Sequence, residues 1–225
     1  MATEVAAQAY LFSRRHEPEQ GTFLRGGHLF FRTTGNETRL FPRSSITLKG
    51  EHNLENVLAA CAIAILAGAP PGITGEVVRN FKGVEHRLEW VAEIDGVNYF
   101  NDSKATNVDA AIKSLESFPG NILLIAGGRD KGGDFTILRP LVEQRVRHLV
   151  VLGEAAGKIR ESLSGATEIS ESASLPDAVA LCRRNARPGD TVLLAPACAS
   201  FDMFENYEHR GTVFKQAVRG LRAGS

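Results

Sequence analysis

The pattern of hydrophobic and polar positions changes between residues 81 and 88. Before that point, short β-like runs are separated by Gly-Gly, Gly-Asn and Pro-Arg pairs, which is typical of an antiparallel meander. One long helix is predicted to follow, from about residue 53 to the Gly-Ala-Pro-Pro stop at 68–71, because its apolar residues recur at helical spacing. The strands predicted in this part cover residues 22–25, 28–33 and 45–48.

After residue 88, strand, loop and helix patterns repeat in order. The runs at 122–126 and 192–195 are continuously apolar, as strands buried on both faces of a parallel sheet must be. Asp95-Gly96 is a hairpin signal, so one edge of the sheet is predicted to be antiparallel. The remaining strands are predicted at 90–94, 97–100, 148–152 and 191–194.

These patterns predict an α/β protein with two parts. Residues 84–225 are predicted to form a doubly wound, mostly parallel Rossmann-like sheet with helices between the strands. Residues 1–83 are predicted to form a smaller α/β part with the antiparallel meander and the long helix.

Composition excludes several classes of protein. Lys plus Arg and Asp plus Glu both number 26, so no net charge attracts nucleic acid or an anionic membrane. The longest apolar stretch, 57–69, is too short to span a bilayer, and the first residues have no signal-peptide pattern, so a cytoplasmic location is expected. Three scattered cysteines and six histidines show no ligand spacing, and no metal site is predicted.

Ligands of doubly wound sheets bind outside the carboxyl ends of the strands. Three polar loops follow predicted strands at such ends, and they contain most of the unusual residues of the chain. We expect the ligand site to be built from residues 101–107, 127–135 and 196–207.

The first loop packs a carboxylate, an amine and hydroxyl groups into one turn. The Asp102 carboxylate can accept a hydrogen bond from a ribose-like hydroxyl, and the Lys104 ammonium can bind a phosphate. The alternative is that Thr106 or Asn107 caps a helix at 108–115 and that the charges are a solvated ion pair. The spacing of these residues leaves both interpretations open.

The second loop places four glycines around Arg129 and Lys131, directly before a helix expected to start at about Phe135. Exposed backbone amides and a helix N-terminus favour an anion site. The phosphate-binding order G-x-x-x-x-G-K-[ST] does not occur in these 225 residues. The alternative is a flexible, solvated surface loop.

The third loop ends an apolar strand with small residues and a hydroxyl. Cys198 has no histidine near it in sequence, and a buried structural thiol is a more common state than a nucleophile. Ser200 lacks the G-x-S-x-G elbow, so it is expected to be a hydrogen-bond donor or a helix cap.

Two further sets of polar residues are candidates for a binding site. Asn53 and Asn56 are three positions apart on one face of the predicted long helix, where paired amides can grip a base or a ribose, although capping by Asn53 is an equal alternative. Arg87, at the change in pattern, either faces a cleft or caps a linker.

Taken together, these segments resemble the Mur ligase superfamily, and within it the branch that adds D-glutamate. The motifs occur in the family's order over most of residues 45–221, and the first 45 residues resemble only a variable part of the family's central domain. Residues 1–83 then correspond to the C-terminal part of the central, ATP-binding domain and 84–225 to the C-terminal, amino-acid-binding domain. The matching segments are HNLEN (52–56), EHR (85–87), NDSKATN (101–107), GGRDKGGDF (127–135) and APACASFDMFENYEHRG (195–211).

The resemblance implies an activity and site residues. Such ligases use ATP and Mg²⁺ to activate the carboxylate of UDP-MurNAc-L-alanine, which the amine of D-glutamate then attacks. The carboxylates of D-glutamate are implied to bind Lys131, Thr106 and Ser200, with Phe201 and Tyr207 closing the pocket. The residues implied to line the ATP or ADP site are Asn53, Asn56, Arg87, Asp102 and Lys104.

The family's phosphate-binding loop, magnesium ligands and UDP-sugar site lie in regions that do not match these residues. Since phosphoryl transfer depends on such groups, we expect a fragment that is inactive by itself. Residues 1–80 are expected either to dock on the second half or to associate with another copy. The alternative functions are a non-catalytic module that binds an acidic amino acid or nucleotide, and a ligase for another amino acid. No G-x-G-x-x-G follows a strand, which argues against a nicotinamide-dependent oxidoreductase.

Overall fold

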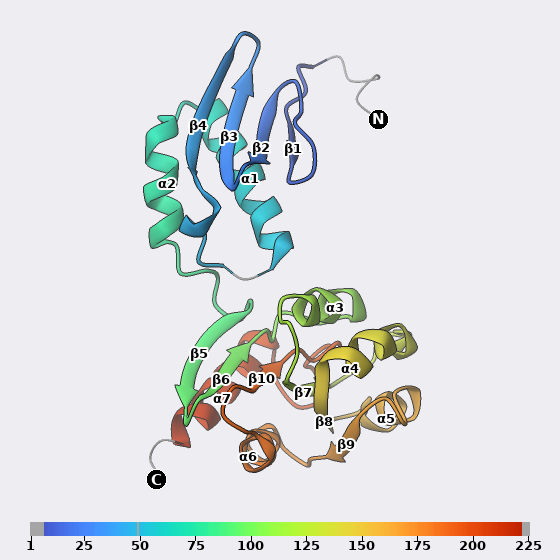
Figure 1. Ribbon diagram of the computed structural model, residues 1–225. Helices are drawn as coiled ribbons and strands as arrows, with labels where there is room; N and C mark the ends of the chain where they lie inside the picture. The colour runs from blue at the N-terminus through green and yellow to red at the C-terminus, as the bar shows by residue number, and fades with distance from the viewer. Residues whose placement is uncertain (1–6, 49, 222–225) are drawn as a thin grey trace. The chain divides into compact units, whose positions relative to one another are not determined.

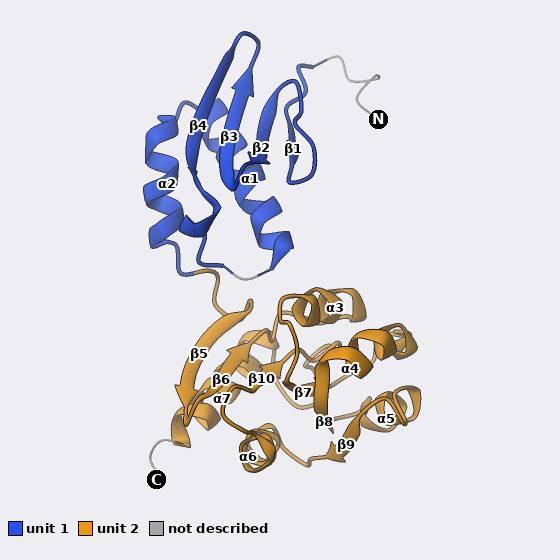
Figure 2. Ribbon diagram, in the orientation of Figure 1, with its two compact units in different colours: residues 1–82 blue, residues 83–225 orange. Residues whose placement is uncertain are grey.

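The computed structural model describes residues 7–48 and 50–221 (Figure 1). The chain divides into two compact units, Met1–Lys82 and Gly83–Ser225 (Figure 2). The division falls where the hydrophobic pattern of the sequence changes, and each unit has buried hydrophobic clusters of its own.

The first unit, Met1–Lys82, is a small mixed sheet packed against helices. Its strand order is β1-β2-β3-β4, in which β2, β3 and β4 form the predicted antiparallel meander and β1 pairs in parallel with β2. Helix α1 packs on β1 and β2, and α2 packs on β4. The elements are β1 (Leu11–Ser13), β2 (Gly21–Arg25), β3 (His28–Thr33), β4 (Asn36–Pro42), the 3-10 helix η2 (Arg43–Ser45), α1 (Glu51–Leu66) and α2 (Pro71–Asn80).

The strand predicted at 45–48 is wrong. The third strand of the meander is β4 instead, and it ends at Pro42. Proline has no N–H to continue a ladder, and the chain turns there into the 3-10 helix Arg43–Ser45.

The prediction of one long helix is also incomplete. Helix α1 begins at Glu51, two residues before the predicted start, and ends at Leu66 before the predicted Gly-Ala-Pro-Pro stop. A second helix, α2, then begins at Pro71. Proline at the first helical position loses no hydrogen bond and presets the backbone angle, so the residues that end one helix also start the next.

The second unit, Gly83–Ser225, is the predicted doubly wound sheet, with strand order β5-β6-β10-β7-β8-β9. The β5–β6 edge is an antiparallel hairpin and the other pairs are parallel, as predicted. The strands are β5 (Glu89–Ile94), β6 (Val97–Asn101), β7 (Ile122–Gly127), β8 (Val146–Leu152), β9 (Glu168–Glu171) and β10 (Thr191–Leu194). The helices are α3 (Val108–Glu116), α4 (Arg139–Arg145), α5 (Ala156–Ser162), α6 (Leu175–Asn185) and α7 (Tyr207–Gly220), and the 3-10 helix η3 (Phe135–Leu138) precedes α4.

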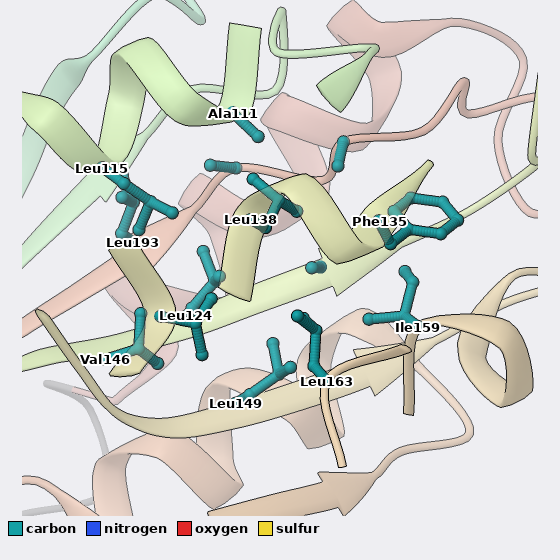
Figure 3. Close-up of a cluster of buried hydrophobic side chains, with 14 of the residues drawn as sticks. Ala111, Leu115, Leu124, Phe135, Leu138, Val146, Leu149, Ile159, Leu163 and Leu193 are labelled. Carbon is teal, nitrogen blue, oxygen red and sulfur yellow. The ribbon is translucent and has the colours of Figure 1, made fainter. Parts of the chain in front are cut away.

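Two hydrophobic clusters cover the two faces of this sheet. Successive side chains of a strand point to opposite faces, so Leu124 belongs to one cluster and Leu123 and Ile125 to the other. The first cluster includes side chains from α3, α4 and α5 (Figure 3), and the second includes side chains from α6 and α7. Because both faces are covered, ligand chemistry is confined to the ends of the strands.

None of the helices in the described part of the chain is both long enough and apolar enough to cross a membrane.

Candidate functional site

The three polar loops come together at the carboxyl ends of β6, β10 and β7. These strands are neighbours in the sheet, so the loops that follow them start side by side. The Asp102 amide donates to the Leu194 carbonyl at 2.8 Å, and the Gly127 amide donates to the Pro196 carbonyl at 2.9 Å. Arg129 and Ala199 exchange two backbone hydrogen bonds, at 2.9 and 3.1 Å. The loops are therefore joined by their own main chains.

Two glycines allow this close approach. Gly127 and Gly128 have φ angles of 131° and 128°, which residues with side chains rarely adopt. A Cβ atom would lie 1.9 Å from the Leu152 oxygen at Gly127 and 2.2 Å from the Ala199 oxygen at Gly128. Glycine is thus required at the first two positions of this loop, because the neighbouring backbone leaves no room for a Cβ atom.

The rest of that loop is organised by Asp130. Its Oδ1 accepts from the amides of Gly132 and Gly133, both at 2.9 Å, and its Oδ2 pairs with Lys158 Nζ at 2.6 Å. The hydrogen bond from Lys158 is the main cause that lowers the pKa of Asp130. The interpretation of this loop as an anion site for a ligand stays a prediction; in this structure a carboxylate of the protein already accepts hydrogen bonds from two of its amides.

Lys131 is exposed beside this turn. No ion pair or hydrogen bond of its ammonium group is found within residues 7–48 and 50–221, whereas the neighbouring Lys158 donates to Asp130 and to the Gly133 carbonyl. Of the two lysines at this loop, Lys131 has the ammonium that is available to an external carboxylate.

The third loop combines a buried hydroxyl residue with an exposed ring. Ser200 is 2% exposed, and its carbonyl oxygen accepts from the amides of Met203 at 3.2 Å and Phe204 at 2.8 Å. The Phe201 ring next to it is 62% exposed. Burial raises the pKa of the Cys198 thiol to about 12, so this cysteine is protonated at neutral pH and fits the structural interpretation rather than that of a nucleophile.

In the first loop, a helix cap lies beside two residues whose ligand-binding roles stay predictions. Asn107 is the N-cap of α3, and its side chain accepts from the Ala110 amide at 2.8 Å, which confirms the capping alternative for this residue. Asp102 is buried and accepts a hydrogen bond from the Ser114 hydroxyl. The Lys104 ammonium lies 4.1 Å from the centroid of the Tyr207 ring, within the range of a cation–π contact.

Arg210, which lies in the matching segment 195–211 but is not among the predicted site residues, links the first and third loops. The Arg210 side chain is buried, with the residue 2% exposed. Its Nε donates to Ser103 Oγ at 3.0 Å, and its Nη2 donates to the Ser103 carbonyl at 2.8 Å. Its Nη1 donates to the Cys198 carbonyl in the third loop at 3.1 Å. Burial lowers the pKa of this guanidinium to about 10, so it stays charged at neutral pH. Its spacing to Phe214 and Val218 on α7, at i+4 and i+8, is the only sequence signal of a buried position.

Seven predicted site residues therefore lie on the three joined loops or at the start of α7 in unit Gly83–Ser225. Arg87 belongs to the same unit, and the carbonyl of its neighbour His86 accepts from the Lys104 amide at 3.1 Å. Among the described residues, no group of three or more His, Cys, Asp or Glu is arranged to hold a metal ion. The seven are Asp102, Lys104, Thr106, Lys131, Ser200, Phe201 and Tyr207.

Asn53 and Asn56 lie in the other unit, on the first turns of α1. The Asn56 amide donates to Asn53 Oδ1 at 3.4 Å. The alternative that Asn53 caps the helix is wrong, because the N-cap position is Gly50, which has no side chain.

Comparison with known proteins identifies the source of these motifs. The family model described as "Mur ligase, glutamate ligase domain" matches residues 86–198, a range that contains the first two loops and all strands of the second unit's sheet. The chain belongs to the Mur ligase family. Two relatives named UDP-N-acetylmuramoylalanine--D-glutamate ligase are 48% and 49% identical to this Mur ligase chain. They come from Koribacter versatilis, with 98% of the chain covered, and Acidobacterium capsulatum, with 100% covered. The chain spans about half the length of these relatives, 49% in each case.

Solved structures share the fold of this Mur ligase chain at low sequence identity. A pseudomurein peptide ligase type C from Methanothermus fervidus matches with a TM-score of 0.67 and 16% identity, over 92% of this chain and 43% of that one. A bifunctional folylpolyglutamate synthase/dihydrofolate synthase from Yersinia pestis matches with a TM-score of 0.64 and 15% identity, over 98% and 49%. At such identity these likenesses show the fold alone.

Proposed function

We propose that this chain supplies the amino-acid-binding unit and part of the nucleotide site of a cytoplasmic ATP-dependent ligase that joins D-glutamate to UDP-MurNAc-L-alanine. The relatives that are almost half identical to this chain are named UDP-N-acetylmuramoylalanine--D-glutamate ligase, which supports these substrates. The observation that carries the proposal is the joining of the three motif loops at one edge of the sheet, with exposed Lys131 and buried Ser200 on neighbouring loops.

In this proposal D-glutamate, a dicarboxylate, binds Lys131, Thr106 and Ser200, with Phe201 and Tyr207 covering it. Lysine and hydroxyl groups donate hydrogen bonds to carboxylates. The exposed Phe201 ring gains burial when a ligand lies under it. The role of these residues is to hold the amine of D-glutamate in place for attack on an acyl phosphate.

The nucleotide is proposed to bind Asn53, Asn56, Arg87, Asp102 and Lys104. An ammonium carries three N–H donors, so the contact of Lys104 with the Tyr207 ring leaves donors for a phosphate. ATP, when bound, supplies the phosphoryl group that activates the acceptor carboxylate. The described residues offer no cluster of Mg²⁺ ligands, and we assign none of them to that ion.

We also propose that residues 1–225 by themselves do not catalyse amide formation, because they contain no phosphate-binding G-x-x-x-x-G-K-[ST] order. An assay of ATP-dependent D-glutamate addition by the purified chain tests this, and measurable turnover would overturn it.

The binding proposal is tested by isothermal titration of D-glutamate into the chain, with L-glutamate as the stereochemical control. Lys131→Ala is expected to weaken binding about tenfold to a hundredfold, the effect of losing one charge-assisted hydrogen bond. Lys113→Ala is the matched control, since Lys113 is exposed on α3 and its ammonium pairs with Glu116 on the same helix. Binding that is equally strong in Lys131→Ala, or stronger for L-lysine or diaminopimelate, would contradict the proposed pocket. Absence of D-glutamate binding in the presence of ADP would also contradict the proposed pocket.

A further inference from the structure

The segment before β5 has an unusual backbone conformation. His86 and Leu88 have φ angles of 64° and 41°, in the left-handed region that residues with a Cβ atom avoid. Such a backbone conformation is unfavourable and persists only where its surroundings hold it. The contacts of residues 85–89 should therefore include groups that hold this turn in place.

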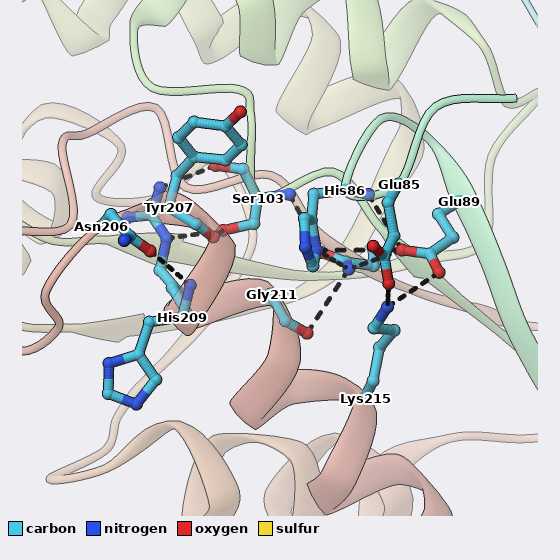
Figure 4. A network of polar contacts seen from close by, with 11 residues as sticks. Glu85, His86, Glu89, Ser103, Asn206, Tyr207, His209, Gly211 and Lys215 are labelled. Atoms are coloured by element: carbon cyan, nitrogen blue, oxygen red, sulfur yellow. Dashed lines mark hydrogen bonds and ion pairs between the residues drawn. The ribbon is translucent and has the colours of Figure 1, made fainter.

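Glu89 is the centre of those contacts (Figure 4). Its Oε2 accepts from the His86 amide at 2.9 Å and from Asn101 Nδ2 at 3.0 Å. Its Oε1 pairs with Lys215 Nζ at 3.1 Å, and the same ammonium pairs with Glu85. Lys215 is a buried cation, with its side chain 8% exposed, so its charge needs these two carboxylates.

Residues 85–89 pack against one face of helix α7. Tyr207, Gly211 and Lys215 are spaced i, i+4 and i+8, on one face of the helix. The Tyr207 ring meets the His86 ring edge-on, with centroids 6.3 Å apart. A Cβ atom at Gly211 would lie 2.1 Å from His86 Nδ1, so only glycine leaves room there. One face of α7 thus contacts residues 85–89 through the Tyr207 ring and the Lys215 ammonium, and Gly211 between them leaves space for the His86 ring.

Asn101 fixes the orientation of the histidine ring. Its Oδ1 accepts from the Ser103 amide at 3.1 Å, which turns its Nδ2 toward His86 Nδ1 at 3.0 Å. In this arrangement His86 Nδ1 accepts the hydrogen bond from Asn101. The His86 carbonyl accepts from the Lys104 amide, so the conformation of this turn is transmitted to the first loop of the site.

We propose that Lys215 is a positioning residue: through Glu89 it holds residues 85–89 in the turn that presents Arg87 and supports Lys104 and Tyr207. Among the described residues, the Lys215 ammonium pairs with Glu85 and Glu89 and contacts none of the proposed ligand-binding side chains, so it acts through these two carboxylates. The proposal rests on the proposed function for its effect on binding, but its effect on the turn is independent of that function.

The test uses the full 225-residue chain with Lys215→Met, which removes the charge and keeps an unbranched side chain, and with Lys215→Arg, which keeps the charge. Amide hydrogen exchange by NMR reads the turn directly at His86. In Lys215→Met, protection of the His86 amide is expected to fall about tenfold or more, as for the loss of support by a charged group. Protection in β7 is expected to stay unchanged. Lys215→Arg is expected to restore protection, and Lys113→Met is the matched control on an exposed helix face.

The second measurement is the affinity for D-glutamate, which is expected to fall several-fold in Lys215→Met and recover in Lys215→Arg. Glu89→Gln is expected to reproduce Lys215→Met, and the double variant to be no worse than either, because the two residues act through one contact. Unchanged protection at His86, equal loss of protection throughout the unit, or a loosened turn with unchanged affinity would each overturn the positioning role. If the unaltered chain binds no D-glutamate, the proposed function fails separately, and exchange at His86 still decides whether Lys215 holds the turn.

Discussion

At the scale of single residues, the Asp130 carboxylate stabilises a glycine-rich loop whose sequence is typical of an anion-binding site. Lys158 and two backbone amides favour its ionised form and lower its pKa. The carboxylate therefore stabilises the folded loop above the ordinary aspartate pKa of about 3.9, and this contribution is lost as the pH falls through the lowered value. Lys158→Ala is expected to move the pKa of Asp130 upward, as measured by carbon-13 NMR titration. Lys113→Ala should leave that titration unchanged, and an unaltered pKa in Lys158→Ala would contradict the assigned cause.

Gly128 gives a second prediction at this scale. Gly128→Ala is expected to destabilise the chain by more than about 2 kcal/mol, since the new Cβ atom meets the Ala199 oxygen in a left-handed backbone region. Gly157→Ala is the matched control, because nothing lies within 4 Å of its added Cβ. On an exposed helix that change should stabilise by about 0.5–1 kcal/mol. Urea unfolding of both variants measures the difference, and equal effects would refute the packing argument.

At the scale of elements, caps connect stability to the site. Asn206 caps α7 by accepting from the His209 amide at 2.6 Å, directly before Tyr207. Asn206→Ala is expected to cost about 1 kcal/mol and also to weaken D-glutamate binding. Ser174→Ala removes the comparable cap of α6, so it should cost a similar amount without changing affinity. The two readouts are chemical denaturation and calorimetric titration, and equal affinity losses would deny α7 a special role.

How well an element can be predicted from sequence depends on how local its causes are. The strands β7 and β10 were predictable because burial on both faces requires unbroken apolar runs. Strand β1 was not, since three residues with Leu11 and Phe12 exposed form a strand only by pairing with β2. Strand β9, with four residues, was also not predicted. Helix α2 was missed because Pro71 was taken as a stop, although proline also starts helices.

The same limit applies to the site. Its three loops were found because glycines and polar residues directly follow buried strands. Arg210 and Lys215 were missed, because their roles come from contacts with Ser103 and Glu89, more than a hundred residues earlier in the chain. Only the folded sheet brings such residues together.

At the scale of the whole molecule, unit Gly83–Ser225 contains two complete hydrophobic clusters. Residues 83–225 expressed by themselves are expected to fold cooperatively, because a chain of this size buries enough surface for stability. Circular dichroism with thermal unfolding measures this, and overlay of amide NMR spectra shows whether the loops keep their conformation. A noncooperative transition would mean that the unit needs residues 1–82.

Self-association through the first unit stays a prediction. Leu11 and Phe12 are 52% and 50% exposed on β1, which is the last strand at its side of the sheet. An exposed apolar edge strand favours pairing with another chain. Light scattering should detect dimers that Phe12→Lys reduces, and a monomer at all concentrations would contradict this expectation.

The strand order of the second unit also has a kinetic consequence. Strand β10 lies between β6 and β7, and its Thr191 pairs with both Asn98 and Ile122. Until the ribosome has released residues 191–194, the middle of the sheet has a gap, and closing it over such a long separation in sequence slows folding. Pulse-labelled hydrogen exchange should therefore find the β7–β8 amides protected before those between β6 and β10. The ligand pocket would then be the last part of this unit to form during folding, and partly folded intermediates would lack it.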